Sequence, residues 1–353
     1  MLVVLYHTEL GFSGGYIGVD VFFIISGYLI TSIILNDIYN EKFRILNFWE
    51  RRVRRILPGL VAVVSTCLVT GWFMFFPADY MSLGRSVLCQ SLLISNLFFW
   101  KTTGYFSTTS TQPLLHTWSL ALEEQFYILF PFLLLALAKF ANRKFIGALI
   151  GFTLISFVVG VCATYCRPTA GFYLLPARAW ELSLGASLAA LPNPSQTTKW
   201  IDESLSWAGL FGILFAALIY DKNTPFPGFA ALVPCIGAAL IIWTNSSSIT
   251  FVGRMLSLRP LVWIGLISYS LYLWHWPVLI FTNYWDQGQP SFTRGLGVVF
   301  LSLALAIVTW KIIETPFRKR LVFPGRASVF TFAGVALATL FVAGHWIYSA
   351  YGF

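Results

Sequence analysis

Apolar runs of about twenty residues recur along the chain from residue 16 to residue 348. As an α-helix, a run of this length spans the hydrocarbon core of a bilayer. Only 10% of the residues are charged, against about 25% in soluble domains. The sequence therefore predicts an all-α polytopic membrane protein, and it excludes a soluble domain with a single anchor.

The spacing of these runs predicts about eleven transmembrane helices, the first one truncated, and one re-entrant segment. The first run, Met1–Leu10, is too short to cross a bilayer. A polar, basic loop is expected over Asn36–Arg55, and the re-entrant segment over Arg85–Trp100, which is apolar but short. The other spans are expected near Tyr16–Leu35, Ile56–Phe76, His116–Ala138, Phe145–Tyr165, Tyr173–Leu191, Ser206–Tyr220, Ala230–Thr244, Leu261–Asn283, Gly295–Ile313 and Ser328–Tyr348.

Positive charge sets the expected orientation, because cytoplasmic loops of membrane proteins are enriched in Lys and Arg. With the N-terminus in the cytoplasm and the C-terminus outside, most basic residues fall in cytoplasmic loops. Only a few remain on the outer side, among them Arg85 and Arg178. The net charge of +9 is explained in this way, so we predict no nucleic-acid partner.

The five cysteines predict neither a metal site nor a redox centre. Cys162 and Cys166 are one helical turn apart, but no further Cys or His cluster joins them. Most of the cysteines lie inside apolar runs, so we expect small, buried and inert thiols. The chain also shows no internal repeat, which disfavours transporters built on inverted repeats.

Several ionisable residues fall at comparable depth on the expected outer side: His7, Asp20, His116, Glu123 and His275. Ionisable groups inside a bilayer are costly, and they are functional candidates for that reason. Imidazole suits proton transfer near neutral pH, and a carboxylate orients it and stabilises its charged form. We therefore expect these residues to line one outward-facing cavity as catalytic candidates. A structural pairing of His7 with Asp20 is the simpler alternative.

A basic cluster, Arg51, Arg52, Arg54 and Arg55, lies on the expected cytoplasmic side. Arginines three residues apart share a helix face, and their guanidinium groups bind phosphate with two hydrogen bonds. Such clusters also act as topology signals or bind anionic lipid. Glu314 is expected at the same side, either in a salt bridge to a neighbouring basic residue or in binding the same ligand.

Taken together, seven stretches resemble the membrane acyltransferase family 3, which acetylates bacterial surface glycans. They follow the family's order along nearly the whole chain. They are VVLYH around His7, GGYIGVDVFFIISGYLIT (14–31), FWERRVRRILP (48–58), GYF (104–106), PLLHTWSLALEEQFYILFP (113–131), ISYSLYLWHWP (267–277) and IETPFRKR (313–320).

The resemblance implies an O-acyltransferase of the bacterial inner membrane, multi-pass, with acetyl-CoA or another acyl-CoA as the cytoplasmic donor and no metal. The implied acceptor is a hydroxyl of O-antigen, capsule, exopolysaccharide or peptidoglycan. His7 matches the family histidine, and it would act as general base or carry the acyl group, oriented by Asp20 or Glu123. The family arginine ten residues earlier would fall four positions before Met1. The donor-binding pair would be Arg52 and Arg55, or Arg51 and Arg54.

The resemblance also implies a domain division: residues 1–320 form the acyltransferase domain, and residues 321–353 form an additional C-terminal transmembrane helix. In some members such a helix leads to a periplasmic SGNH-type domain. Two other function classes remain open from the sequence. A flippase for a lipid-linked sugar or acyl carrier would need neither His7 nor the arginines, and an inactive scaffold would follow from loss of the family arginine.

Overall fold

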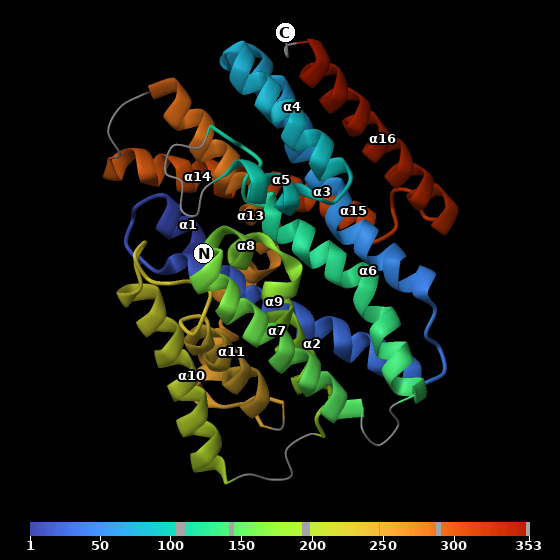
Figure 1. Cartoon of the computed structure of the whole chain (residues 1–353), viewed down its shortest axis with the longest axis vertical. Coiled ribbons are helices and arrows are strands. Elements are labelled where there is room, and N and C mark those ends of the chain that lie inside the picture. The colour runs from blue at the N-terminus through green and yellow to red at the C-terminus, as the bar shows by residue number, and fades with distance from the viewer. Residues whose placement is uncertain (104–110, 141–144, 193–197, 247, 287–290, 351–353) are drawn as a thin grey trace.

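The chain folds into a bundle of α-helices, and no strand occurs among the residues described (Figure 1). The computed structural model describes residues 1–103, 111–140, 145–192, 198–246, 248–286 and 291–350. The longer helices are α2 (Gly18–Tyr39), α3 (Ile45–Met74), α4 (Pro77–Ser91), α6 (Thr117–Phe140), α7 (Phe145–Cys166), α9 (Leu175–Ala190), α10 (Lys199–Ile219), α11 (Leu232–Thr244), α13 (Arg259–Asp286), α14 (Phe292–Val308) and α16 (Arg326–Ala350). The short ones are α1 (Leu2–His7), α5 (Ser95–Thr102), α8 (Pro168–Tyr173), α12 (Phe251–Leu256) and α15 (Thr315–Arg318).

Membrane crossing is supported by length and composition. In the described part of the chain, eight helices are long and apolar enough to span a bilayer, counting α14 with its π-helical and α15 continuation. The helices α1, α9 and α11 are shorter than this, with 6, 16 and 13 residues. The all-α polytopic fold is therefore confirmed, whereas the number of eleven spans stays a prediction.

The expected basic loop over Asn36–Arg55 is wrong. Helix α2 continues to Tyr39 and α3 already begins at Ile45, so only residues 40–44 separate them. The basic stretch is helical because it packs one side on the bundle: Phe48 and Arg54 are buried, whereas Arg51 and Arg55 are exposed. A transmembrane helix longer than the hydrocarbon core projects beyond it in this way.

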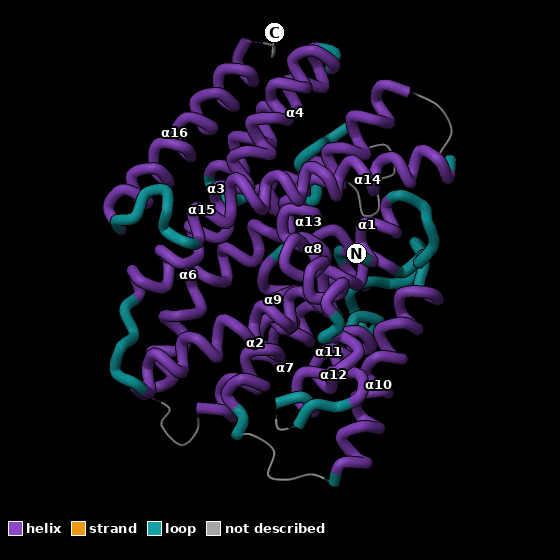
Figure 2. Tube along the Cα trace, turned by 180° about the vertical axis from the view of Figure 1, so that it is seen from behind, coloured by secondary structure: helices purple, strands orange, loops and turns teal. Residues whose placement is uncertain are grey.

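Helices α4 and α5 form a hairpin where the re-entrant segment was expected. Asp79 in the first turn of α4 accepts hydrogen bonds from Thr111, which follows α5, and from Tyr284 at the end of α13 (3.0 and 2.9 Å). The chain therefore enters and leaves this hairpin at the same end of the bundle. The hairpin lies beside α16 (Figure 2), where the backbones approach closely because Gly84 and Gly344 face each other.

The expected span Tyr173–Leu191 is broken at Leu174 into α8 and α9, with Pro176 in the first turn of α9. Helix α9 packs against α2 through glycines. A Cβ on Gly185 would lie 2.0 Å from the carbonyl oxygen of Ile24, and one on Gly27 would lie 1.8 Å from that of Leu182. Only glycine allows this contact, which brings the polar side chains of the two helices together.

Two side-chain expectations also need correction. Arg178, counted among the basic residues of the outer side, is 1% exposed inside the bundle. Cys162 and Cys166, expected to be buried, are exposed on α7, whereas Cys67 and Cys235 are buried. Exposure on a membrane helix is contact with lipid, so an apolar run by itself does not show whether a thiol faces lipid or protein. The GYF motif (104–106) lies outside the described residues.

Candidate functional site

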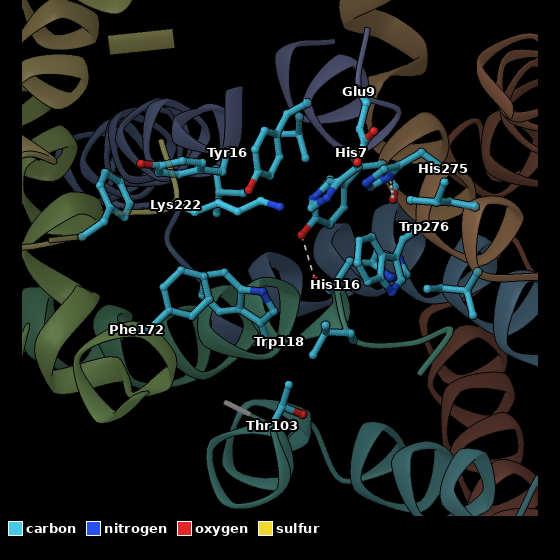
Figure 3. Close-up of a pocket in the computed structure, with 18 of the residues that line it drawn as sticks. His7, Glu9, Tyr16, Thr103, His116, Trp118, Phe172, Lys222, His275 and Trp276 are labelled. Carbon is cyan, nitrogen blue, oxygen red and sulfur yellow. Dashed lines mark hydrogen bonds between the residues drawn. The ribbon is translucent and has the colours of Figure 1, made fainter. Parts of the chain in front are cut away.

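The three histidine candidates, His7, His116 and His275, come together in one cavity of about 940 Å³, named here the histidine cavity (Figure 3). The ring centroids of His7 and His275 are 5.6 Å apart, and those of His116 and His275 are 5.7 Å apart. His7 ends α1, His116 precedes α6, and His275 lies in the middle of α13. The expected convergence of the histidines is therefore present in the structure.

Hydrogen bonds fix the tautomer of one of these rings. His275 Nδ1 lies 2.6 Å from the carbonyl oxygen of Tyr272, which can only accept. The proton is thus on Nδ1 in the neutral ring, and Nε2 carries a lone pair. That Nε2 is buried and has no hydrogen-bond partner among the described residues, and the same holds for both nitrogens of His116. An unpartnered buried imidazole nitrogen is available to a ligand hydroxyl.

Tyr272 links the histidines of α6 and α13. Its hydroxyl donates to the carbonyl oxygen of His116 (2.7 Å) and is 2.6 Å from Ser119 Oγ. Its own carbonyl holds the ring of His275. One residue on α13 therefore sets the positions of two imidazoles, and reasoning from the sequence did not identify it. The SYSLYLWHWP motif contains it, so the motif was the available signal.

Aromatic side chains form much of the cavity wall. Trp276 packs its edge against His7, with centroids 4.6 Å apart, and Trp118 packs on Phe172 at 4.5 Å. Flat aromatic faces together with a few polar groups are typical of pockets that hold an amphipathic ligand such as a sugar ring. The exposed residues Glu9 and Lys222 lie at the rim, so the cavity opens to the surface there.

Asp20 lines the same cavity but is paired with an arginine. Its Oδ1 is 3.0 Å from Nη1 of Arg178, whose Nη1 is also 2.8 Å from Glu181. Among the hydrogen bonds of the described residues, neither Asp20 nor Glu123 bonds to an imidazole. The structure thus brings Asp20 to the cavity wall as half of an ion pair. The two residues that complete this pairing, Arg178 and Glu181, were not among the sequence candidates.

Glu123 lies deeper in the bundle, in a second group of polar side chains. Ser26 donates to it at 2.7 Å and Tyr127 also donates to it. It follows His116 by seven residues, so it is about 10 Å further along α6. Arg52 is within electrostatic range of Glu123 and Glu124. Glu123 therefore lies near the basic cluster of α3 and further along α6 than the histidines.

The four arginines of the basic cluster divide between two faces of α3. Arg54 is buried, pairs with Glu50 at 2.9 Å and donates to the carbonyl oxygen of Phe323 at 2.8 Å. Arg51 is exposed and pairs with Asp37. Arg52 instead lies over the ring of Tyr127, and its buried Nε has no hydrogen-bond partner among the described residues.

Glu314 is buried in a π-helical turn, Thr309–Glu314, that continues α14. It accepts a hydrogen bond from Ser270 on α13, and Arg55 is within electrostatic range of it. The described ion pairs do not include the expected local salt bridge of Glu314. π-Helical turns are rare and often occur at functional sites, where they redirect a side chain.

A family model described as "Acyltransferase domain" matches residues 1–311. The chain is 33% identical to the O-acetyltransferase OatA of Staphylococcus aureus (strain NCTC 8325) over 342 residues. It is 34% identical to the putative peptidoglycan O-acetyltransferase YrhL of Bacillus subtilis over 342 residues, and 31% identical to the peptidoglycan O-acetyltransferase OatA of Listeria monocytogenes over 337 residues.

These alignments cover 90% of this chain and 55%, 52% and 54% of the three relatives. The chain therefore spans about half the length of the curated relatives it matches. No solved structure matches the chain significantly.

Proposed function

This chain belongs to the acyltransferase family, and from this premise we propose that it transfers an acetyl group from a cytoplasmic acyl-CoA to a hydroxyl of a cell-surface glycan. Peptidoglycan is the acceptor that the names of two of the relatives support. O-antigen, capsule and exopolysaccharide are the alternatives implied by the family resemblance. A bacterial inner-membrane location with a cytoplasmic N-terminus belongs to the same proposal.

The observation that carries the proposal is the meeting of three imidazoles in a surface-open, aromatic-walled cavity. Trp118, Phe172 and Trp276 offer faces on which a sugar ring can pack. The sugar hydroxyl would then reach the imidazoles, where a neutral ring nitrogen accepts its proton. A cavity for transport alone has no need of such a cluster.

The acyl donor would dock at the N-terminal part of α3, a helix that does not line the histidine cavity. Arg52 and Arg55 are the pair that fits, because Arg54 and Arg51 are held by Glu50 and Asp37. The unpartnered Nε of Arg52 is available for a phosphate oxygen. Glu123 lies about 10 Å along α6 from His116 and within electrostatic range of Arg52, so the thioester arm would extend along α6 from the arginines toward the histidines.

In the proposed reaction, His7 takes the proton of the acceptor hydroxyl. The hydroxyl oxygen forms a bond to the acyl carbon, the carbon–sulfur bond of the thioester breaks, and the proton passes from the imidazole to the leaving thiolate. Transient acylation of His7 is a second route with the same overall balance. The ring of His275 lies 5.6 Å from that of His7, so a neighbouring hydroxyl of the sugar can donate to Nε2 of His275 and hold the acceptor in place.

The test is acyl transfer by the purified protein in nanodiscs, with labelled acetyl-CoA and a soluble glycan fragment. We expect His7→Ala to reduce transfer by at least about 100-fold, the usual contribution of general base catalysis. His345→Ala is the matched control, because His345 is exposed on α16. Retained transfer by folded His7→Ala would refute the role of His7. Transport of a lipid-linked sugar without acetyl-CoA consumption would favour a flippase.

A further inference from the structure

A second cavity, of about 420 Å³, lies at the arginine end of α3, and we name it the Glu50 cavity. Its lining combines one acidic and three basic side chains from α3 and from the segment that leads into α16. The lining residues are Asn47, Glu50, Arg51, Arg320, Pro324 and Arg326. Neither the catalytic proposal nor the donor site uses this cavity.

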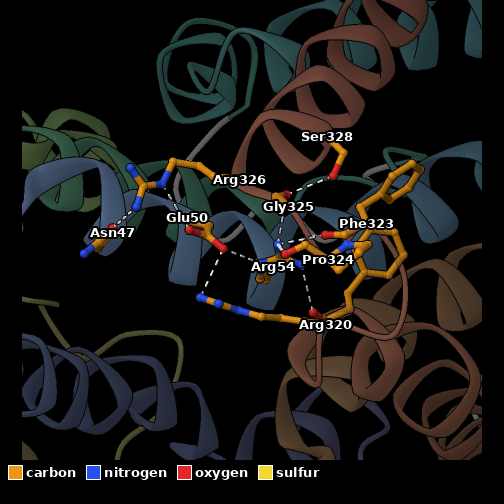
Figure 4. A network of polar contacts seen from close by, with 10 residues as sticks. Asn47, Glu50, Arg54, Arg320, Phe323, Pro324, Gly325, Arg326 and Ser328 are labelled. Atoms are coloured by element: carbon orange, nitrogen blue, oxygen red, sulfur yellow. Dashed lines mark hydrogen bonds and ion pairs between the residues drawn. The ribbon is translucent and has the colours of Figure 1, made fainter.

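Glu50 is the centre of the cavity (Figure 4). Its carboxylate, with 5% of the side chain exposed, is 2.9 Å from Arg54, 3.2 Å from Arg320 and 3.3 Å from Arg326. Three guanidinium groups around one carboxylate leave positive charge in excess. Arg54 is buried, but the side chains of Arg320 and Arg326 are 59% and 42% exposed. Arg326 also donates to Asn47 through Nη2.

The backbone of this segment is held in an uncommon conformation. Arg320 and Phe323 both have positive φ, 59° and 51°, which is costly for residues with a side chain. Arg54 stabilises it by donating to the carbonyl oxygens of Phe323, Pro324 and Gly325 at 2.8, 3.2 and 3.2 Å. These contacts hold the backbone between the two outer arginines, and the ion pairs with Glu50 orient both of their side chains.

The Glu50 cavity is separate from the proposed donor site. Asn47, Glu50 and Arg54 are spaced by three and four residues and share one face of α3. Arg52 is on another face, over the ring of Tyr127. Two exposed leucines are sequence neighbours of lining residues: Leu46 precedes Asn47 and Leu321 follows Arg320, and they are 48% and 73% exposed. Basic donors next to exposed apolar side chains, at the end of spanning helices, match the border between phospholipid headgroups and acyl chains.

We propose that the Glu50 cavity binds the phosphate group of an anionic phospholipid, with Arg320 and Arg326 as the donors and Leu46 and Leu321 in contact with the acyl chains. The bound phosphate balances the excess charge around Glu50. Arg320 and Arg326 both pair with Glu50 of α3, so a phosphate bound to the two guanidinium groups also strengthens the link between α3 and the start of α16. The lipid thus holds the last helix against the bundle.

The test measures binding of phosphatidylglycerol and phosphatidylcholine to the whole protein in detergent, by native mass spectrometry. We expect the wild type to prefer phosphatidylglycerol. The double variant Arg320→Gln/Arg326→Gln, which lacks both outer guanidinium groups, should bind it about 10- to 30-fold more weakly. Arg259→Gln is the matched control, because Arg259 is exposed at the start of α13. Its affinity should stay within about twofold of the wild type.

Equal phosphatidylglycerol affinity in all three proteins would overturn the proposal, because it would mean diffuse attraction only. Adenosine 3′,5′-bisphosphate separates the other phosphate source. If it displaces phosphatidylglycerol, and the double variant no longer binds it, the cavity belongs to the donor nucleotide and the lipid proposal is wrong. Leu321→Glu is a second test that does not depend on the folding of the double variant, because Leu321 is mostly exposed and its replacement should leave the fold intact. Its added negative charge should weaken phosphatidylglycerol binding, and unchanged binding would count against the site.

Discussion

Asp20 on α2 and Arg178 on α9 form an ion pair inside the bundle, with Oδ1 and Nη1 3.0 Å apart and neither side chain more than 1% exposed. The guanidinium group of Arg178 also lies over the rings of Phe23, Trp118 and Phe172 at 5.6 to 5.7 Å. Both charged residues line the histidine cavity. One wall of the candidate site therefore depends on a buried charge pair between two helices.

We expect Arg178→Met to destabilise the protein by about 3–5 kcal/mol, because it leaves the buried carboxylates of Asp20 and Glu181 without their cation. Thermal unfolding in detergent measures the change. Arg51→Met is the control: its pair with Asp37 is at the surface, and such pairs contribute about 0–1 kcal/mol. Equal unfolding temperatures for the two variants would show that the buried pair is not needed for stability.

His275→Asn separates the two ring nitrogens of this histidine. The asparagine amide can still donate to the Tyr272 carbonyl as Nδ1 does, but the acceptor at Nε2 is lost. We expect acetyl transfer to fall by about 100-fold while the unfolding temperature changes little. The comparison is with His345→Asn on α16, which should transfer normally. Full activity of His275→Asn would show that transfer does not depend on the hydrogen-bond acceptor at Nε2 of this ring.

Arg52 and Arg54 should differ in what they support, although they are two residues apart. Arg52→Ala is expected to weaken acyl-CoA binding by about tenfold or more with the fold intact, since it loses a free phosphate donor. Arg54→Ala should lower stability, because Glu50 and three backbone carbonyls lose their partner. Calorimetry with acetyl-CoA and thermal unfolding measure the two effects. The reverse pattern would point to Arg51 and Arg54 as the donor pair.

Tyr272→Phe removes only the hydroxyl that joins α13 to the carbonyl of His116. We expect the free energy of unfolding to fall by about 1 kcal/mol. The activation free energy of acetyl transfer should rise by more than this, because His116 is no longer held in position. Steady-state kinetics should show the fall in kcat, with the KM for acetyl-CoA unchanged. Ser119→Ala, which removes one partner of the same hydroxyl, should have a smaller effect. A change in KM alone would contradict a positioning role.

The helices and the histidine cluster were predictable for a physical reason. Apolar runs of bilayer length can only be helices when they cross lipid, and a charged or imidazole side chain inside such a run must face protein or a cavity. These rules led to His7, His116 and His275 without a structure. The same rules did not identify the partners of Arg178, because charge counts assign an arginine to one side of the membrane and do not detect a buried partner.

The division of the basic cluster was also beyond the sequence. Arg51, Arg52, Arg54 and Arg55 offered two pairs with the same spacing. The choice depends on what packs against each face of α3: the segment before α16 covers Arg54, and Tyr127 of α6 lies under Arg52. Contacts between residues more than 70 positions apart decide this, and local spacing carries no information about them.

The sequence by itself determined that this chain is an all-α membrane protein of the acyltransferase type, because hydrophobic length and motif order are properties of the linear chain. The tertiary structure alone decided that Asp20 pairs with Arg178 and that Tyr272 holds His116 and His275 together. It also separated the Glu50 cavity from Arg52. These relationships join helices that are distant in sequence, and they exist only once glycines such as Gly185 let the helices approach.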